Sequence, residues 1–297
     1  MKLSIIIINW NTKELIKKCL NSVLKYTSFT DYQLIVIDNN SSDGSQKFLS
    51  DFCLQNKLNL KIILNNQNKG FAQAVNQGLK IAQGEYILLL NPDTEIKEKT
   101  LSEVIDFISL DKSIGILGGK ILNPNGSHQP SVRSFPTLSS QIFILLKLHH
   151  FFRNKAVKKY LVIDFDYSKT QEVDQVMGAF FLIRRKVIEQ IGYFDDKFFL
   201  WFEEVDFCKR AKDTGWKILY CHKIEIIHCG GASFSQKSSF RNQCQFNKSL
   251  LYYFKKHHGL LKYYLLLFLL PFNLFLTTII SFLPFLRRFK KDIKIRF

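Results

Sequence analysis

The chain has 297 residues, 46% of them hydrophobic and 23% charged, which is enough for one large domain or two small ones with a sizeable core. Its net charge of +17 predicts an anionic partner: nucleic acid, an acidic membrane surface or a phosphorylated substrate. The six cysteines form no C-x-x-C pair, so a reducing compartment is favoured over a disulfide-linked fold. Cys221-His222 and His228-Cys229 lack the spacing of a common zinc site.

The first hundred residues alternate between two patterns. Short apolar runs that indicate buried strands occupy residues 5–8, 34–37, 60–64 and 86–90. Apolar residues at helical spacing indicate helices over residues 15–24, 48–53, 71–82 and 101–108. Strands that alternate with helices predict an α/β fold with a mostly parallel central sheet and helices on both of its faces.

Polar residues follow each of these four strands. They are Asn9-Trp10-Asn11, Asp38-Asn39-Asn40, Asn65-Asn66 and Asn91-Pro92-Asp93. Ligands of open α/β sheets bind at the carboxyl ends of the strands, so we expect these side chains to line one crevice. Asn and Asp also begin turns, which would explain any one of the four ends alone. Their recurrence after all four strands favours a binding site.

The expected crevice lacks the common nucleotide-binding motifs. Neither a G-x-x-x-x-G-K-[ST] loop nor a G-x-G-x-x-G motif follows the first strand. A carboxylate at a strand end can instead hold a divalent cation that bridges a diphosphate, and Asp93 is the natural candidate. Pro92 fixes its own φ and restricts Asn91, which would hold Asp93 in a set direction.

The second half of the chain predicts two more strands, over residues 176–184 and 217–221, with a short helix over residues 186–191 between them. His228 follows the second of these strands and precedes a pair of glycines. A metal-ligand or phosphate-facing role and a purely structural role are both open for this histidine.

Three acidic residues lie close together beyond that short helix. Glu203, Glu204 and Asp206 fall in the first turn of a helix that is predicted to end at Gly215, just after four aromatic residues between positions 198 and 202. Acids in a first turn are favoured by the helix dipole, which is a structural explanation. Burial beside aromatic rings would raise a carboxylate pKa toward the range of a general base, and we favour this functional interpretation.

The C-terminal segment from Tyr263 to Leu286 is apolar and long enough to span a bilayer, which takes about 20 residues. Pro271, Pro284 and the basic clusters on both sides favour a re-entrant or interfacial helical hairpin over a simple span. A buried core helix or a dimer interface is the alternative. Residues 141–165 mix aromatic and basic side chains and are expected to touch the same membrane surface.

The order of these motifs resembles family 2 glycosyltransferases of the GT-A fold, a Rossmann-like α/β fold, and most closely the rhamnosyltransferase-type members that build bacterial surface polysaccharides. The resemblance covers about residues 2–233. It is carried by the segments SIIIINWNT, VIDNNSSDGS, NKGFAQAVNQGL, LLLNPDTEI, MGAFFLIRR, GYFDDKFFLWFEEVDFCKRAKDTGWKI and HCGGAS.

The resemblance, together with the polar strand ends, implies a set of residues that contact the nucleotide of the donor. They are Asn9, Asn11, Asp38, Asn40, Asp43, Asn68, Gly70, Asn76 and Asn91. Asn91 and Asp93 match the D-x-D metal motif with Asn in place of the first Asp. The resemblance therefore implies that Asp93 carries a divalent cation, Mg²⁺ or Mn²⁺, and that His228 helps to coordinate it.

The resemblance also implies the chemistry. Glu204 matches the position of the general base, which is usually the Asp of a Glu-Asp pair. The Glu-Glu pair here leaves open whether Glu203 or Glu204 is the base, and Asp206 is a third catalytic candidate. The implied reaction is inverting: the base deprotonates an acceptor hydroxyl, which displaces the nucleoside diphosphate from the anomeric carbon while the cation stabilises the leaving group.

The expected partners are a nucleotide-diphosphate sugar, with deoxythymidine diphosphate rhamnose suggested by the resemblance, a saccharide or lipid-linked acceptor, and the cytoplasmic face of a bacterial inner membrane. No nucleic acid is expected. We expect residues 1–110 to form the nucleotide-sugar-binding half, residues 111–255 the acceptor and catalytic half, and residues 256–297 an apolar, basic-flanked membrane-associated tail.

Two other functions fit parts of the sequence. A nucleotidyltransferase also uses a strand-end carboxylate and a cation, but Asn9-Trp10-Asn11-Thr12 stands where such enzymes carry a Gly-rich, basic loop. A non-catalytic basic scaffold on a membrane surface or nucleic acid would explain the charge but would not need Asp93 or Glu204.

Overall fold

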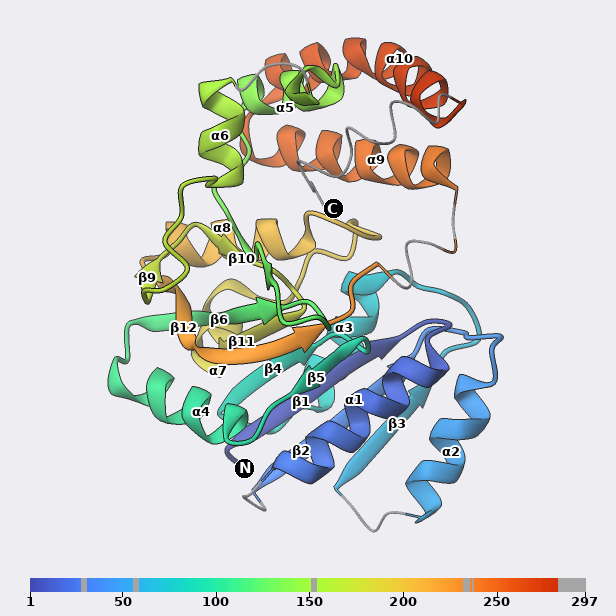
Figure 1. The fold of residues 1–297 in the computed structure, drawn as a ribbon, viewed down its shortest axis with the longest axis vertical. Coiled ribbons are helices and arrows are strands. Elements are labelled where there is room, and N and C mark those ends of the chain that lie inside the picture. Colours follow the sequence, from blue (N-terminus) through green and yellow to red (C-terminus); the bar gives the residue numbers. More distant parts are fainter. Residues whose placement is uncertain (28–30, 56–58, 151–153, 232–235, 237, 283–297) are drawn as a thin grey trace.

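A mixed ten-stranded sheet forms the centre of the protein (Figure 1). The structure is a computed structural model, and it describes residues 1–27, 31–55, 59–150, 154–231, 236 and 238–282. Its main path runs in the order β3-β2-β1-β4-β11-β6-β12-β5, with β7 paired to β6 and β9 paired to β12. The strands of this sheet are β1 (Leu3–Asn9), β2 (Tyr32–Asp38), β3 (Leu60–Leu64), β4 (Tyr86–Leu90), β5 (Thr94–Ile96), β6 (Ile114–Leu122), β7 (His128–Gln129), β9 (Gln171–Glu172), β11 (Phe180–Arg184) and β12 (Lys217–His228). A separate short pair joins β8 (Val132–Arg133) to β10 (Gln175–Val176).

The direction of the strands confirms the prediction of a mostly parallel sheet. β1, β2, β3 and β4 are parallel, so their carboxyl ends lie along one edge. β11 inserts antiparallel between β4 and β6, and β12 then pairs parallel with β6. The start of β11 and the end of β4 therefore lie together at the edge where the predicted binding residues gather.

Helices cover both faces of this sheet, as predicted. One face carries α1 (Lys13–Tyr26), α2 (Ser45–Gln55) and α4 (Thr100–Leu110), and the other carries α3 (Phe71–Ile81), α7 (Arg185–Ile191) and α8 (Glu203–Asp213). Alternate residues of β1 serve the two cores: Ile5 and Ile7 pack on the first face, and Ile6 and Ile8 on the second. Burial on both sides explains why these strands are continuously apolar.

Four further helices lie at one end of the molecule, at the top of Figure 1. They are α5 (Leu138–Leu145), α6 (Lys155–Leu161), α9 (Ser239–His257) and α10 (Leu260–Phe282), and a 3₁₀ turn at Leu148–His150 lies between α5 and α6. We call α5, α6, α9 and α10 the helical layer. Its core also takes in the loop before α8, and its buried members are Leu145, Phe198, Phe202, Val205, Phe246, Leu250, Tyr253, Phe254 and Leu266.

The sequence patterns miss β6 because its three glycines lower the β propensity of an otherwise apolar run. Packing explains one of them: a Cβ atom on Gly118 would lie 2.6 Å from Cβ of Val176. β12 extends beyond its predicted end at Cys221 to His228, through an irregularity in its pairing with β6. That extension carries His228 to the carboxyl-end edge of the sheet.

The expectation that Pro271 helps to break the apolar tail into a helical hairpin is wrong, because α10 runs unbroken through this residue. Residues 260–280 of this helix are long and apolar enough to cross a membrane by length and composition. Buried Asn273 nevertheless ties α10 to the fold: its Oδ1 accepts from Nδ2 of Asn247 at 2.9 Å, and its Nδ2 donates to the carbonyl of Leu145 at 2.7 Å. Pro284 and the basic cluster after it lie outside the described residues.

We predict that Asn273→Leu lowers the free energy of unfolding by about 1–3 kcal/mol, because it leaves the amide of Asn247 and the carbonyl of Leu145 buried without partners. Urea denaturation measures the change. The matched control is Phe268→Leu on the exposed side of the same helix, where the change should stay within about 0.5 kcal/mol. Equal effects of the two substitutions would contradict this account of how α10 is held.

Candidate active site

The strand-end residues Asn9 and Asp38 meet at the edge of the sheet. Nδ2 of Asn9 donates to Oδ2 of Asp38 at 2.7 Å. Oδ1 of Asp38 accepts from the backbone of Ser41 at 2.8 Å and from Nε2 of Gln46 at 3.0 Å. Asp38 is fully buried. Its carboxylate therefore joins the loop after β2 to the end of β1 and to α2.

The loops after β1 and β2 are held together by two more of the predicted residues. Asn11 has a positive φ of 51°, and its Oδ1 accepts from the backbone of Ser42 at 2.7 Å. Asp43 accepts from the backbone of Lys13 at 2.8 Å and from that of Ser45 at 3.0 Å, at the starts of α1 and α2. Asn40, with φ of 67°, is exposed. These contacts hold the loops after β1 and β2 together at the carboxyl-end edge of the sheet.

Gly70 brings the start of α3 against the loop that precedes the acidic helix. Its φ is +84°, and a Cβ atom there would lie 2.6 Å from the carbonyl oxygen of Phe199. The backbone of Phe71 donates to that same oxygen at 2.8 Å. Oδ1 of Asn68 accepts from the backbone of Gly70 at 2.9 Å. The aromatic loop is thereby fixed to the edge of the sheet where the parallel strands end.

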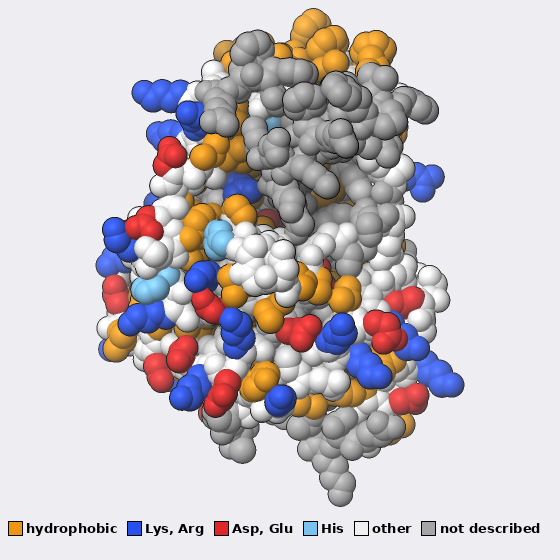
Figure 2. Space-filling model, viewed as in Figure 1, with side chains coloured by type: hydrophobic (Ala, Val, Ile, Leu, Met, Phe, Trp, Pro, Cys, Tyr) orange, Lys and Arg blue, Asp and Glu red, His pale blue; other side chains and the backbone are white. Residues whose placement is uncertain are grey.

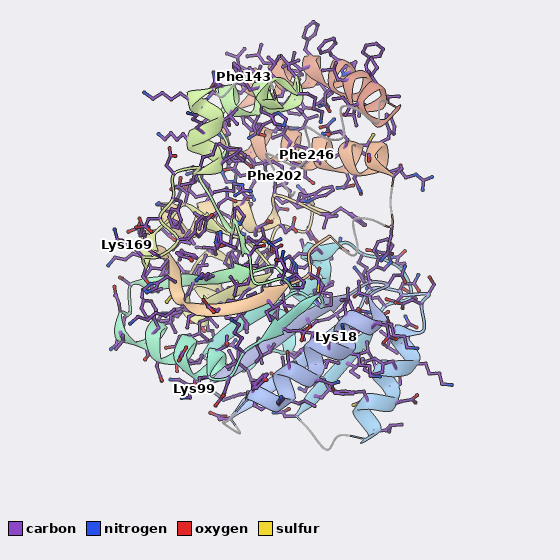
Figure 3. All side chains as sticks on the ribbon, viewed as in Figure 1. Lys18, Lys99, Phe143, Lys169, Phe202 and Phe246 are labelled. Carbon is purple, nitrogen blue, oxygen red and sulfur yellow. The ribbon has the colours of Figure 1, made fainter. Side chains whose placement is uncertain are left out.

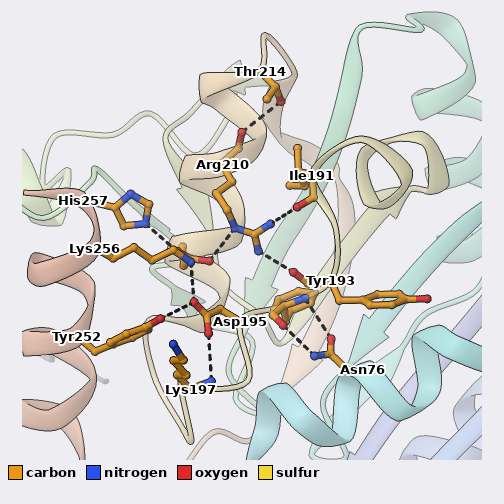
Figure 4. A network of polar contacts seen from close by, with 12 residues as sticks. Asn76, Ile191, Tyr193, Asp195, Lys197, Arg210, Thr214, Tyr252, Lys256 and His257 are labelled. Atoms are coloured by element: carbon orange, nitrogen blue, oxygen red, sulfur yellow. Dashed lines mark hydrogen bonds and ion pairs between the residues drawn. The ribbon is translucent and has the colours of Figure 1, made fainter.

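Asn76 lies farther along α3 and contacts a different segment of the chain. Its amide nitrogen donates to the carbonyl of Phe194 at 2.8 Å, and its amide oxygen accepts from the backbone of Phe194 at 3.1 Å (Figure 4). Both functions of the side chain are used to hold the segment that leads into the aromatic loop.

Asp93 and His228 lie together, although they are far apart in the sequence. Asp93 follows β4 and His228 ends β12, and Oδ1 of Asp93 is 3.2 Å from Nε2 of His228. Both side chains are buried. Asn91 shapes the turn between β4 and Asp93. The carbonyl oxygen of Asn91 accepts from the backbone N–H of Thr94 at 3.2 Å and from the hydroxyl of Thr94 at 2.6 Å.

Gln129, which the sequence patterns miss, is the partner of His228. Its Oε1 lies 2.8 Å from Nδ1 of His228, and its side chain is buried. A carbonyl oxygen in this position requires the hydrogen of a neutral imidazole to be on Nδ1. Nε2 of the same ring faces the carboxylate of Asp93. No sequence pattern marks Gln129, because β7 is only two residues long. Its position beside His228 depends on the pairing of β7 with β6, which is a tertiary contact.

This arrangement fits a divalent cation. An imidazole nitrogen and a carboxylate oxygen 3.2 Å apart are both groups that can serve as ligands of one divalent cation. No group of three or more His, Cys, Asp or Glu side chains with metal-ligand geometry occurs among the described residues. Asp93 and His228 would supply two protein ligands, and a Mg²⁺-type ion that is bound by few protein ligands completes its shell with substrate phosphates and water.

The acidic helix α8 begins after a strained turn. Trp201 and Phe202 have φ values of 64° and 69°, a left-handed conformation that bulky side chains rarely adopt. The ring of Phe202 packs against that of Phe246 on α9, with centroids 5.3 Å apart (Figure 3). Packing from α9 thus holds the strained turn that aims the next two residues, Glu203 and Glu204.

Glu203 and Glu204 each bury an oxygen atom, Oε2, for which the described part of the chain provides no hydrogen-bond partner. Burial, and then the charge of Glu204, raise the pKa of Glu203 well above its ordinary value. Burial also raises the pKa of Glu204. Glu203 is 4% exposed, whereas Glu204 is less completely buried. One member of this pair can hold a proton while the other accepts one.

Asp206 is in a different environment from its two neighbours, although it shares their helical turn. It accepts from Nε of Arg210 at 2.8 Å, Nζ of Lys256 at 2.8 Å and Nε2 of His257 at 2.7 Å. Burial opposes its ionisation, but the hydrogen bonds from His257 and Lys256 and the charge of Arg210 lower its pKa to about 2. Lys256 also contacts Asp195 at 2.7 Å, so one network joins α8, α9 and the segment before the aromatic loop (Figure 4).

The mostly parallel sheet, its strand-end acid and the acidic helix α8 define a fold of the GT-A glycosyltransferase type. A mannosyltransferase from Pyrobaculum calidifontis, in complex with GDP-Man and Mn²⁺, is similar with a TM-score of 0.59 and 16% identity, over 86% of this chain and 63% of that one. S. aureus TarS 1–349 is similar with a TM-score of 0.55 and 20% identity, over 86% and 72% of the two chains.

The sequence profile of glycosyl transferase family 2 matches residues 4–192, and the chain belongs to this family. Hexosyltransferase Agl10 of low-salt glycan biosynthesis from Haloferax volcanii is 28% identical over 230 residues, which are 76% of this chain and 66% of that protein. An N-acetylglucosaminyl-diphospho-decaprenol L-rhamnosyltransferase from Mycobacterium tuberculosis is 24% identical over 76% of each chain. Rhamnosyltransferase WbbL from Escherichia coli is 27% identical, over 79% of this chain and 87% of that protein. The resemblance to rhamnosyltransferase-type family members is thereby confirmed.

We predict that the network around Asp206 makes stability depend on pH. Because the folded-state pKa of about 2 lies below the ordinary value of 3.8, the contribution is present above pH 4 and is lost as the pH falls toward 2. The shift corresponds to about 2 kcal/mol. Urea denaturation between pH 6 and about pH 2.5 measures it: Asp206→Asn should remove most of this contribution at pH 6 and flatten the pH dependence. Asp31→Asn, at an exposed carboxylate, is the control. A variant at Asp206 with the wild-type pH profile would contradict the assignment.

Proposed function

We propose that this chain catalyses the inverting transfer of a sugar from a nucleoside-diphosphate donor to an acceptor hydroxyl group. The observation that carries the proposal is the pair of buried carboxylates at the strained start of α8. Buried oxygens without partners and a strained backbone both lower stability, and they persist where function requires them. The raised pKa values of both carboxyl groups suit a residue that exchanges a proton with a substrate.

Glu204 is the general base of this proposal. It is the more accessible member of the pair, so an acceptor hydroxyl group can reach it, and it matches the family position of the base. Glu204 takes the hydroxyl proton as the acceptor oxygen attacks the anomeric carbon and the bond to the diphosphate breaks. Glu203, more deeply buried, keeps its own proton while Glu204 is ionised, because two adjacent charges in this environment would repel. Asp206 is then a positioning residue, since Arg210, Lys256 and His257 already contact its carboxylate.

Asp93 and His228 hold a divalent cation, Mg²⁺ or Mn²⁺, in this proposal. When bound, such a cation neutralises the charge that develops on the leaving diphosphate. Gln129 fixes the ring of His228 so that Nε2 faces Asp93. The presence of Mn²⁺ in the complex of the Pyrobaculum mannosyltransferase supports this part of the proposal. The predicted nucleotide-contacting residues, of which Asn9 is the first and Asn91 the last in the chain, form the surface for the nucleotide. Asn76 contributes indirectly, through its hydrogen bond to Phe194.

The expected donor is deoxythymidine diphosphate rhamnose, and the expected acceptor is a saccharide or a lipid-linked saccharide. The names of the mycobacterial and E. coli relatives support rhamnose, and the decaprenol in the first of them supports a lipid carrier. We place the enzyme at the cytoplasmic face of a bacterial inner membrane. Within the chain, we assign donor binding to residues 1–110, acceptor binding and catalysis to residues 111–255, and membrane association to residues 256–297.

We predict that Asp93→Asn weakens Mn²⁺ binding at least tenfold in the presence of a nucleoside diphosphate, because it removes the anionic ligand. Gln129→Leu should weaken it about tenfold by freeing the ring of His228. The free Mn²⁺ signal in electron paramagnetic resonance, titrated with dTDP, UDP and GDP in turn, reports binding without turnover. Lys120→Gln, at a surface ion pair, is the matched control. Wild-type affinity in Asp93→Asn would exclude this cation site.

We predict that Glu204→Gln lowers sugar transfer by about 100-fold or more while donor binding persists, because the base is lost. Glu203→Gln, the matched neighbouring change, should keep a larger part of the activity. In the wild type, kcat/KM should fall on the acidic side at a pH above the ordinary Glu range, because only the ionised base works and its pKa is raised. Greater loss in Glu203→Gln would reverse the two roles. Failure of every donor in a panel of nucleotide sugars to bind or react would overturn the proposed function.

A further inference from the structure

One face of α10 is apolar and open to solvent. Leu261, Tyr264, Leu265, Phe268, Phe272, Phe275 and Ile279 recur at spacings of three and four residues and are each between 37% and 84% exposed. That spacing places them on one side of the helix, which we call the α10 stripe. Orange side chains at the top of Figure 2 mark this end of the molecule. An exposed apolar stripe of this length in one helix indicates an interaction surface.

The opposite side of α10 is packed against the protein. Leu266 and Asn273 are fully buried, and Asn273 bonds to α9 and to the end of α5. A helix that crosses a bilayer beside this fold would leave that packing or carry the helical layer into the hydrocarbon. The helical layer contains a buried network of polar side chains and several exposed lysines, which are costly there. The packing therefore favours a helix that lies along a surface with only its stripe immersed.

The charge around the stripe identifies the kind of surface. The segments that contain the helical layer, residues 134–163 and 239–282, each have five Lys or Arg and no Asp or Glu. Lys155, Lys158, Lys159 and Lys255 are exposed, and Nζ of Lys255 lies 5.9 Å from the ring of Tyr263 at the start of α10. The chain after the described residues adds six more Lys or Arg within positions 287–297. An apolar stripe with a basic surround matches an anionic lipid interface.

We propose that α10 lies in the plane of an anionic membrane, with its stripe immersed below the headgroups and the lysines of the helical layer on the lipid phosphates. The inference deepens the proposed function, and rests on it only for the lipid-linked acceptor that such a surface would present. The network of Asp206, Lys256 and Asp195 then transmits the position of α9 and α10 to the start of α8. The acidic pair would be held at a set height above the lipid surface.

The test uses the full chain and sedimentation with vesicles. Wild type should bind vesicles of equal parts phosphatidylcholine and phosphatidylglycerol at least tenfold more tightly than vesicles of phosphatidylcholine alone. The triple change Phe268→Ser, Phe272→Ser and Phe275→Ser should lower binding at least tenfold. The matched control is Leu54→Ser with Leu110→Ser, two exposed leucines on α2 and α4, and it should bind as wild type. Lys155→Gln, Lys158→Gln and Lys159→Gln together should lower binding to the anionic vesicles only.

Depth separates an in-plane helix from a span. Tyr264→Trp, Phe272→Trp and Ile279→Trp, each compared with the parent chain, should all be quenched most by lipids brominated near the headgroup. Strongest quenching of Phe272→Trp by bromines deep in the bilayer would show a span and overturn the proposal. An absence of vesicle binding would also overturn the proposal. So would a wild-type dimer that the triple change converts to a monomer, because the stripe would then bind a second copy of the chain. Donor turnover measured without vesicles should be unaffected by the triple change. Vesicle binding without any donor turnover would remove the proposed function and leave the docking surface in place.

Discussion

The turn at Trp201 and Phe202 is the constraint on which the geometry of the site depends. Two consecutive bulky residues in the left-handed region cost on the order of 1–3 kcal/mol each. The cost is offset by packing, because Phe202 is buried against α9 and the hydroxyl of Ser249 on α9 donates to the carbonyl of Leu200 at 2.7 Å. Without α9 the turn would lose this packing, and the direction of Glu203 and Glu204 follows from the turn.

The same loop connects the two sides of the molecule. Its Phe199 carbonyl accepts from the start of α3, which lies at the carboxyl ends of the parallel strands, while Phe202 belongs to the core of the helical layer. The buried acidic pair is therefore located by contacts on both sides. Asp206, in the first turn of α8, adds a link to α9 through its contacts with Lys256 and His257. A movement of α9 relative to the sheet would change the position of the acidic pair. The helical layer therefore influences the geometry of the site directly.

The Asp93–His228 pair shows a second kind of constraint, in which the sheet provides the precision. The two residues come from β4 and β12, which are separated on the sheet by β11 and β6, and the short β5 brings the chain after Asp93 back to pair with the end of β12. The backbone of Cys229 donates to the carbonyl of Asp93 at 2.9 Å, so the pairing continues up to the side chains themselves. Gln129 sets the orientation of the histidine ring. A site built on paired strands holds its ligands more rigidly than one built on loops.

The sequence by itself determined the α/β class, the parallel strands at the N-terminal end, and the convergence of polar residues at one edge, because strand and helix periods are local patterns and parallel strands must end together. It also determined the family, through an ordered set of short motifs. It left β6 unassigned, since Gly115, Gly118 and Gly119 weaken the strand pattern. These glycines are explained by the close packing of neighbouring residues against the strand. Only the tertiary structure separated three neighbouring acids into a buried pair and an ion-paired Asp206, because the difference depends on Lys256 and His257 of α9, 50 and 51 residues farther along the chain. The partner of His228 and the single exposed face of α10 were likewise decided by contacts between distant segments, which no local pattern encodes.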